Sequence, residues 1–91
     1  MTYKFKPSAL KDLKKLQQDI QKRVIDKLDF YTADQNPLRF AKFIEDKQLG
    51  SFRYRVGDYR IVFDIVDESL IVLAIAHRKD IYQWKITIKQ L

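Results

Sequence analysis

Cysteine is absent from the 91-residue sequence, and glycine and proline occur only twice each. Without cysteine the chain has no disulfide framework, no thiol nucleophile and no cysteine-ligated zinc. So little glycine and proline argues against a loop-rich fold or a flexible linker. A single histidine, His77, with no His-x-x-Glu pairing, argues against a metal site. The sequence therefore predicts a regular domain that needs neither a metal nor another cofactor.

Long apolar runs are also missing. The longest covers 70–76, which is too short to cross a bilayer. The N-terminal segment MTYKFKPSALKDL lacks the apolar stretch of a signal peptide. We therefore expect a cytoplasmic protein that does not act on a membrane.

Composition and charge are those of a basic globular protein. The chain is 46% hydrophobic and 33% charged, and 91 residues suffice for one modest core, so we expect a single domain over 1–91. Lysine and arginine outnumber aspartate and glutamate by 18 to 12, for a net charge of +6. This excess favours a polyanionic partner: nucleic acid, an acidic protein or, as the weakest alternative, an anionic membrane.

Helical periodicity dominates the first part of the chain. Apolar residues recur at helical spacing over 9–16 and again over 20–32, which predicts two antiparallel helices. Ser8 and Asp19 stand where capping side chains for these helices belong. One long bent helix is the alternative.

Shorter elements flank the helices. The segment 3–5 alternates and precedes a proline, which is typical of a first strand. Asn36-Pro37 is a cap followed by proline at the first helical position, which favours a short helix over 37–43.

From Ser51 the hydrophobic period changes to two, which predicts three strands over 51–56, 59–66 and 70–78. Turns separate them, and a helical turn at 80–84 with a final strand could follow. The order is β-α-α-β-β-β. It predicts an α+β domain in which two antiparallel helices pack on one face of a small, mainly antiparallel sheet.

The turn Gly57-Asp58 fixes the register of the first hairpin. A two-residue turn that begins with glycine places Arg55 opposite Arg60 and Arg53 opposite Val62. Because side chains alternate between the faces of a sheet, the aromatic and aliphatic residues of the hairpin share the face toward the helices. Arg53, Arg55 and Arg60 share the other face.

Folding alone does not explain this arrangement, because like charges in opposed pairs destabilise a sheet. Arginine forks match phosphate geometry, so a phosphate-bearing ligand would turn the repulsion into attraction. A solvated outer face with splayed arginines is the plainer interpretation.

The next strand decides whether Arg78 joins these arginines. If the turn at 67–69 has three residues, Arg60 lies opposite Ala76 and Arg78 falls on the arginine side. If it has two, Arg78 points the other way. Tyr82 lies four residues beyond Arg78 and could stand at the rim of the same surface.

Arginines and tyrosines suit one reaction in particular, the metal-free cleavage of RNA in which the substrate's 2′-hydroxyl attacks the adjacent phosphate. Arginines stabilise the charge of the phosphorane, and a tyrosine among cations has a lowered pKa that suits a proton acceptor.

Two segments, GSFRYRVGDYRIVF at 50–63 and AIAHRKDIY at 74–82, make the chain resemble the RelE/ParE toxin superfamily. The resemblance covers essentially the whole chain. It implies a small sheet packed on two helices, cleavage of mRNA on the ribosome in the A site, and neutralisation by a small acidic antitoxin.

The resemblance also implies roles for single residues. Arg53 and Arg55 match basic positions that hold substrate phosphates, and Arg60 matches the arginine that stabilises the scissile phosphate. Arg78 matches an arginine proposed as acid or charge stabiliser, and Tyr82 a tyrosine proposed to activate the 2′-hydroxyl.

Some roles stay open within this resemblance. Arg53 and Arg55 replace the lysines of the best-known RelE, which keeps the charge but makes poorer proton carriers. His77 could contact RNA or share the acid–base work, or it could be a strand-end residue without a chemical role.

Two other functions fit the same scaffold. One is a ParE-like toxin that inhibits DNA gyrase by binding it, although such members generally lack the full arginine and tyrosine set. The other is a basic module that binds RNA or an acidic protein without catalysis.

Overall fold

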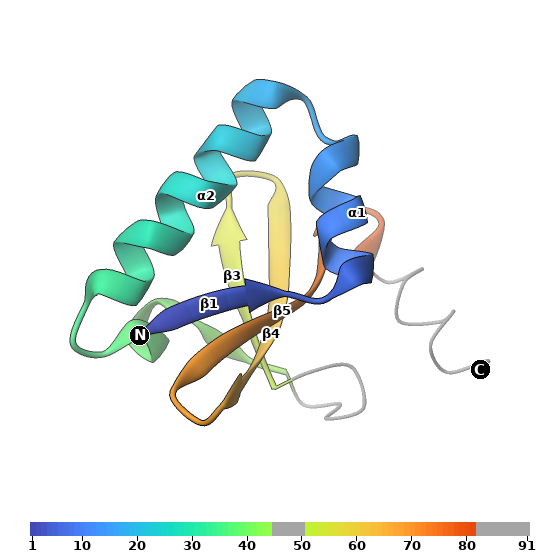
Figure 1. Cartoon of the computed structure of the whole chain (residues 1–91). Helices are drawn as coiled ribbons and strands as arrows, with labels where there is room; N and C mark the ends of the chain where they lie inside the picture. Colours follow the sequence, from blue (N-terminus) through green and yellow to red (C-terminus); the bar gives the residue numbers. More distant parts are fainter. Residues whose placement is uncertain (45–50, 82–91) are drawn as a thin grey trace.

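A twisted five-stranded sheet organises residues 1–44 and 51–81, which are the residues described by the computed structural model. The strand order is β1-β5-β4-β3-β2, with β1 parallel to β5 and the other neighbours antiparallel (Figure 1). The elements follow in chain order: β1 (Thr2–Phe5), α1 (Pro7–Lys15), α2 (Gln18–Ala33), the 3₁₀ turn η1 (Pro37–Phe40), β2 (Lys42–Phe43), β3 (Phe52–Val56), β4 (Tyr59–Val66) and β5 (Ser69–His77). The predicted α+β class is confirmed.

Two separate helices are present, and the alternative of one bent helix is wrong. The backbone is extended at Leu16 and Gln17, and the Gln21 side-chain amide donates to the Leu16 carbonyl oxygen at 2.8 Å. The break therefore carries a hydrogen bond that replaces part of the interrupted helical ladder.

Both predicted caps are wrong. Proline at the first position of α1 has no N–H to be capped, so the helix begins at Pro7 and Ser8 lies inside its first turn. Asp19 likewise lies inside the first turn of α2, where its charge favours the positive end of the helix dipole. None of the described helices is long and apolar enough to cross a membrane.

The predicted helix over 37–43 is also wrong. Only 37–40 coil, as η1, and the chain then extends at Ala41 into the edge strand β2. Pairing with β3 competes successfully with helix formation, because Lys42 and Phe43 lie opposite Arg53 and Phe52. The predicted helical turn at 80–84 falls mostly, and the predicted final strand wholly, outside the described residues.

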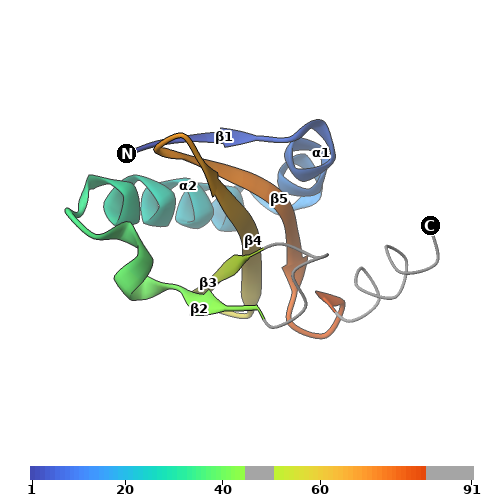
Figure 2. The ribbon, with the colours of Figure 1, turned by 90° about the horizontal axis from the view of Figure 1, so that it is seen from below.

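The core lies between the two helices and one face of the sheet, which curves partly around α2 (Figure 2). Its centre is a stack of aromatic rings, in which Tyr54 lies 4.4 Å from both Tyr31 and Phe63, centroid to centroid. Tyr54 and Phe63 are fully buried. Burying a large side chain contributes on the order of 1.5–3 kcal/mol, so this stack fixes α2 on the hairpin.

The hairpin register is as predicted. Arg55 lies opposite Arg60, Tyr54 opposite Ile61 and Val56 opposite Tyr59. Gly57 has a φ of +58° and Asp58 does not have a positive φ, which is the pattern of a type II′ turn. At the second hairpin both turn residues, Asp67 and Glu68, have positive φ, as in a type I′ turn.

Replacing Tyr54 by phenylalanine tests the link between β3 and η1. The Tyr54 hydroxyl donates a buried hydrogen bond to the Pro37 carbonyl oxygen at 2.9 Å, and its loss should cost about 1–2 kcal/mol of unfolding free energy. Tyr3→Phe is the matched control, because it removes an exposed bond to Asp29. Urea denaturation should show the smaller loss for Tyr3→Phe; equal losses would contradict the assignment.

Candidate functional site

Four arginines gather on the sheet face that points away from the helices. Arg53 and Arg55 come from β3, Arg60 comes from β4, and Arg78 directly follows β5. We name this set the arginine face. Its backbone floor carries small or aliphatic residues, since Val62 pairs with Arg53 and with Ala74, and Ala76 pairs with Arg60. The predicted clustering of Arg53, Arg55 and Arg60 is confirmed.

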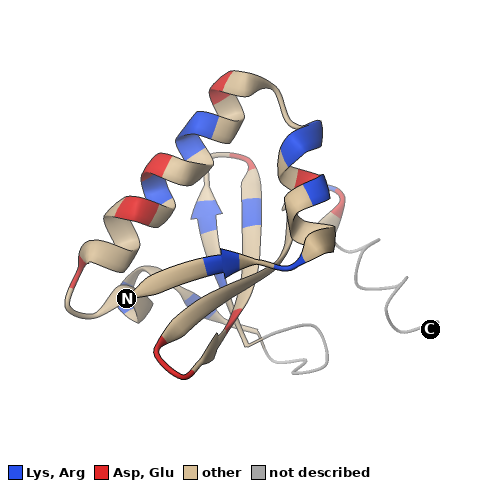
Figure 3. Ribbon diagram, viewed as in Figure 1, with Lys and Arg blue, Asp and Glu red and all other residues tan. Residues whose placement is uncertain are grey.

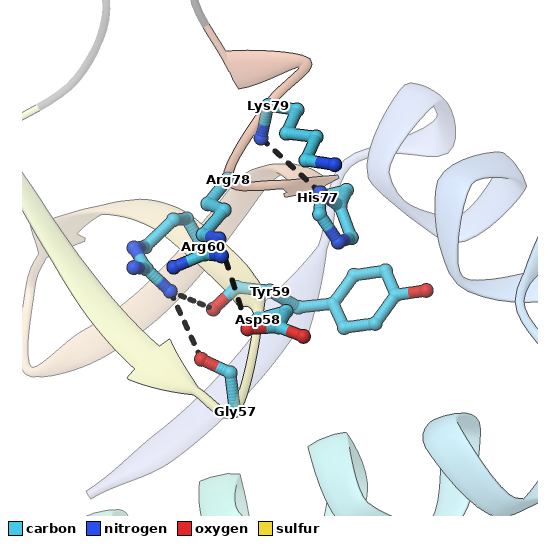
Figure 4. Close-up of polar contacts among 7 residues, drawn as sticks. All are labelled: Gly57, Asp58, Tyr59, Arg60, His77, Arg78 and Lys79. Carbon is cyan, nitrogen blue, oxygen red and sulfur yellow. Dashed lines mark hydrogen bonds and ion pairs between the residues drawn. The ribbon is translucent and has the colours of Figure 1, made fainter.

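Arg60 is the centre of this face. Its Nη1 donates to the carbonyl oxygens of Gly57 at 3.1 Å and of Tyr59 at 3.0 Å, which folds the guanidinium over the turn (Figure 4). Burial lowers the pKa of Arg60, and the neighbouring charges of the other three arginines lower it further, while Asp58 raises it. The field at this point is therefore strongly positive, and an anion placed there would relieve it.

A small pocket of about 100 Å³ opens beside Arg60. Arg53, Arg55 and Arg60 line it together with Lys42 and Phe40. Sequence reasoning missed Lys42, because it was assigned to a helix. Its place opposite Arg53 in the edge strand puts its side chain on the arginine face. The only sequence pattern that could have predicted this strand is the alternation of Lys42 and Phe43, and two residues are too few to be specific.

Arg78 lies beside Arg60 for a reason that differs from either predicted alternative. The turn before β5 has two residues, yet Arg60 still pairs with Ala76. A β-bulge explains this outcome, because Val62 pairs with Ala74 while Phe63 pairs with Val72, which leaves Leu73 as an extra residue. The extra residue restores the register that a three-residue turn would have given.

Backbone contacts hold the segment at Arg78 against the first hairpin turn. The Arg78 N–H donates to the Asp58 carbonyl oxygen at 2.7 Å, while its Nε lies 3.8 Å from the Asp58 carboxylate (Figure 4). Both side chains are more than half exposed, so this ion pair contributes little stability. The backbone of Arg78 is thus fixed, and its guanidinium can exchange Asp58 for another anion.

The structure does not bring His77 together with the arginines. Its ring lies on the opposite face, edge-on to Tyr59 with centroids 5.4 Å apart, and its Nδ1 accepts from the Lys79 N–H at 3.2 Å. Tyr82, the predicted base, lies outside the described residues. The roles predicted for both residues stay predictions.

Positive charge is not confined to this face, since lysines and arginines also line both helices (Figure 3). The arginine face differs from those helix faces because its positive charges lie directly across from one another, around one pocket. A larger hollow of about 590 Å³ lies elsewhere, between the N-terminus and the β4–β5 turn. Its charged side chains, Asp34, Asp67 and Glu68, are all acidic, so it does not suit a polyanion.

This chemistry is that of anion binding and charge stabilisation. Guanidinium groups donate hydrogen bonds and stay protonated, so they can hold phosphate oxygens but cannot act as bases. Within residues 1–44 and 51–81, no three acidic or histidine side chains lie close enough together to hold a metal ion.

Comparison with known proteins shows to which family the chain belongs. The model of the family described as ParE toxin of the type II toxin–antitoxin system, parDE, matches residues 3–82. Toxin RelG of Mycobacterium tuberculosis is 34% identical over 84 residues, which cover 90% of this chain and 95% of that protein. The chain belongs to the RelE/ParE toxin superfamily.

Solved structures of RelE toxins have the same fold. In the RelB-RelE antitoxin–toxin complex from Methanococcus jannaschii, the match has a TM-score of 0.69 and 27% identity, over 88% of this chain and 95% of that chain. In the RelBE2 toxin–antitoxin complex from M. tuberculosis, the values are 0.68 and 32%, over 85% and 96%. This RelE-like chain is therefore the toxin component of a toxin–antitoxin pair.

Arg55→Gln tests whether repulsion between the arginines of this face destabilises the folded protein. Removing one member of the opposed pair should raise the unfolding free energy by a few tenths of a kcal/mol at low salt, because like charges directly opposite destabilise a sheet. The gain should shrink at high salt. Lys22→Gln is the control, because Lys22 is an exposed residue of α2. It should give no comparable gain in unfolding free energy in denaturant melts. An Arg55→Gln variant less stable than the parent would contradict the prediction.

Proposed function

We propose that this RelE-like toxin is a metal-independent endoribonuclease that cleaves mRNA in the ribosomal A site and so inhibits translation. The observation that carries the proposal is the position of Arg78 beside Arg60, on the face that also holds Arg53 and Arg55. This juxtaposition supplies charge on both sides of one phosphate.

In the proposed reaction, the substrate's 2′-oxygen bonds to the adjacent phosphorus while the bond from phosphorus to the 5′-oxygen breaks. The products are a 2′,3′-cyclic phosphate and a 5′-hydroxyl. A base takes the proton of the 2′-hydroxyl, and the leaving 5′-oxygen takes up a proton. The phosphorane between these steps carries extra negative charge, which preorganised cations stabilise more strongly than they stabilise the ground state.

Each residue has a proposed part in this reaction. Arg53 and Arg55, with Lys42 beside them, hold substrate phosphates in the pocket. Arg60 stabilises the phosphorane, because its guanidinium is fixed by two backbone carbonyls and needs little reorganisation. Arg78 stabilises the leaving oxygen. Resemblance to the family assigns proton acceptance to Tyr82.

A small acidic antitoxin is the proposed protein partner. Support comes from the net charge of +6 and from the M. jannaschii and M. tuberculosis structures, which are complexes of toxin and antitoxin. A basic surface attracts an acidic chain at a rate that depends on salt.

The ParE description of the matching family motivates a second candidate, a toxin that inhibits DNA gyrase by binding it. The two proposals differ in what they require. Gyrase binding needs a complementary surface, whereas RNA cleavage needs the arginines to converge on one phosphate. The position of Arg55, Arg60 and Arg78 on one face of the sheet therefore favours cleavage.

Induced expression with transcript mapping tests the proposal. The parent should arrest translation and produce cuts in ribosome-bound mRNA, detected by primer extension. Arg60→Ala should lower cleavage about 100- to 1000-fold, because it removes a preorganised charge at the phosphorane. Arg78→Ala and Tyr82→Phe should also reduce it, whereas Lys22→Ala should not. Intact mRNA with accumulation of gyrase-cleaved plasmid would overturn the ranking.

Two neighbouring residues at the end of β5 give a sharper comparison. Arg78 and His77 are adjacent in sequence but lie on opposite faces. Arg78→Ala should mainly lower kcat, because the charge acts on the transition state. If RNA extends to the helix side of the strand, His77→Ala should raise KM without lowering kcat. A fall in kcat for His77→Ala would instead assign it part of the acid–base work.

A further inference from the structure

Three side chains of α2 form a stripe beside β3. Arg23, Lys27 and Phe30 are four and three residues apart, so they lie on one face of the helix. Arg23 marks one end, at the tip of the first hairpin, because a Cβ on Gly57 would lie 3.1 Å from the Arg23 Nη2 atom. Phe30 marks the other end, with its ring centroid 5.7 Å from that of Phe40 in η1. We name Arg23, Lys27 and Phe30 the α2 stripe.

Both ends of the α2 stripe meet the arginine face. Gly57, which Arg23 contacts, also accepts a hydrogen bond from Arg60 Nη1 through its carbonyl oxygen at 3.1 Å. Phe40, which Phe30 contacts, lines the pocket of the arginine face. Among the described strands, β2 pairs with only the first two residues of β3, so no strand covers the rest of that edge. The stripe therefore continues the arginine face around the edge of β3.

The charges of the α2 stripe are available to a ligand. Arg23 and Lys27 are exposed, and within residues 1–44 and 51–81 neither forms an ion pair. Asp26 is exposed on the same helix and pairs with neither of them. The Phe30 ring is 60% exposed, and the Lys27 Nζ lies 5.8 Å from its centroid. Single-stranded nucleic acids bind this combination, with phosphates on cations and bases on aromatic rings.

We propose that the α2 stripe binds the single-stranded RNA that continues from the scissile phosphate, with phosphates on Arg23 and Lys27 and a base stacked on Phe30. Arg23 and Phe30 are seven residues apart, about 10 Å along the helix, which leaves room for more than one phosphate. Every nucleotide supplies both a phosphate and a flat ring, which an acidic peptide does not. The identity of this RNA as the mRNA being cut rests on the proposed function, but binding of single-stranded RNA does not.

NMR titration with single-stranded RNA tests the stripe without requiring cleavage. The probes are a trinucleotide and a decanucleotide, both carrying 2′-O-methyl groups so that they cannot be cut. Arg23→Gln and Lys27→Gln should each weaken binding of the decanucleotide about 3- to 10-fold at low salt, and lower the slope of log K against log salt by about 0.7. Binding of the trinucleotide, which the arginine face can hold alone, should not change.

Lys22→Gln is the matched control for charge. Lys22 is the exposed neighbour of Arg23, but it lies about 100° away around α2, so its loss should not change the affinity for the decanucleotide. Losses equal to those of Arg23→Gln would overturn the inference. A parent that binds the decanucleotide no more tightly than the trinucleotide would overturn it as well.

Phe30 variants separate stacking from charge. Phe30→Ala should weaken binding of the decanucleotide about 5- to 100-fold with an unchanged salt slope, because it removes a stacking surface. Phe30→Trp should restore the affinity. Val66→Ala is the control, because Val66 is 54% exposed at the end of β4, and it should have no effect. Unchanged affinity in Phe30→Ala would overturn the stacking role.

Asp26→Asn should have the opposite effect and tighten binding of the decanucleotide about 2- to 5-fold, because it removes a negative charge beside the stripe. Damage to the fold cannot produce such a gain. Asp29→Asn changes the net charge equally, on the side of α2 that contacts Tyr3 in β1, and should not tighten binding. Equal gains would assign the effect to net charge and overturn the stripe.

Cleavage on the ribosome tests whether the bound RNA is the mRNA. The codon before the A site is paired with tRNA, so the free chain continues on the 3′ side. With an mRNA that extends beyond the A-site codon, the Arg23→Gln, Lys27→Gln double variant should raise KM about 10-fold and leave kcat unchanged, as loss of uniform binding does. With an mRNA that ends at this codon, it should match the parent.

The remaining outcomes separate the two proposals. Equal slowing on both mRNAs would place ribosomal RNA on the stripe and overturn its assignment to mRNA. A parent that cuts neither mRNA would refute the proposed function, and the NMR titration would still decide whether the stripe binds RNA.

Discussion

The pairing of β4 with its two neighbours is the constraint on which the rest of the molecule depends. One face of β4 must meet the helices, so Ile61 and Phe63 are buried, and Arg60 must then point away from them. The register with β3 places Arg55 opposite Arg60, and the register with β5 places Ala76 there. A slip of one residue on either side would bury an arginine or expose the aromatic stack. Core packing therefore enforces the arrangement that concentrates charge.

How far sequence reasoning reaches can be judged from the two hairpins. Gly57-Asp58 allows one short turn, and alternation then fixes every pair of the first hairpin, so the positions of Arg53, Arg55 and Arg60 were predictable. The second hairpin was not, because turn length alone does not set its register. The bulge at Leu73 lies where α1 contacts β5, and α1 is more than sixty residues away in sequence. The edge strand β2 escaped prediction for a similar reason, since two residues have no periodicity of their own and extend only because β3 is available.

Charge on this sheet has a cost for folding and a use for binding. Arg60 has a lowered pKa because it is partly buried near three other arginines, so the free protein holds these charges in an unfavourable field. The core contributes the compensating stability, through rings such as Tyr54 and Phe63 that are fully buried directly beneath the same strands. An anionic ligand would offset this repulsion. Tight packing on one face and closely spaced like charges on the other are both features that a preorganised anion site requires.

Small movements of backbone register can control such a site more strongly than changes of side-chain identity. Arg78 and His77 are adjacent, and a single inserted residue decides which of them lies on the arginine face. Core packing favours the bulged register, because it buries Ile75, whereas a strand without the extra residue would place Ala74 there.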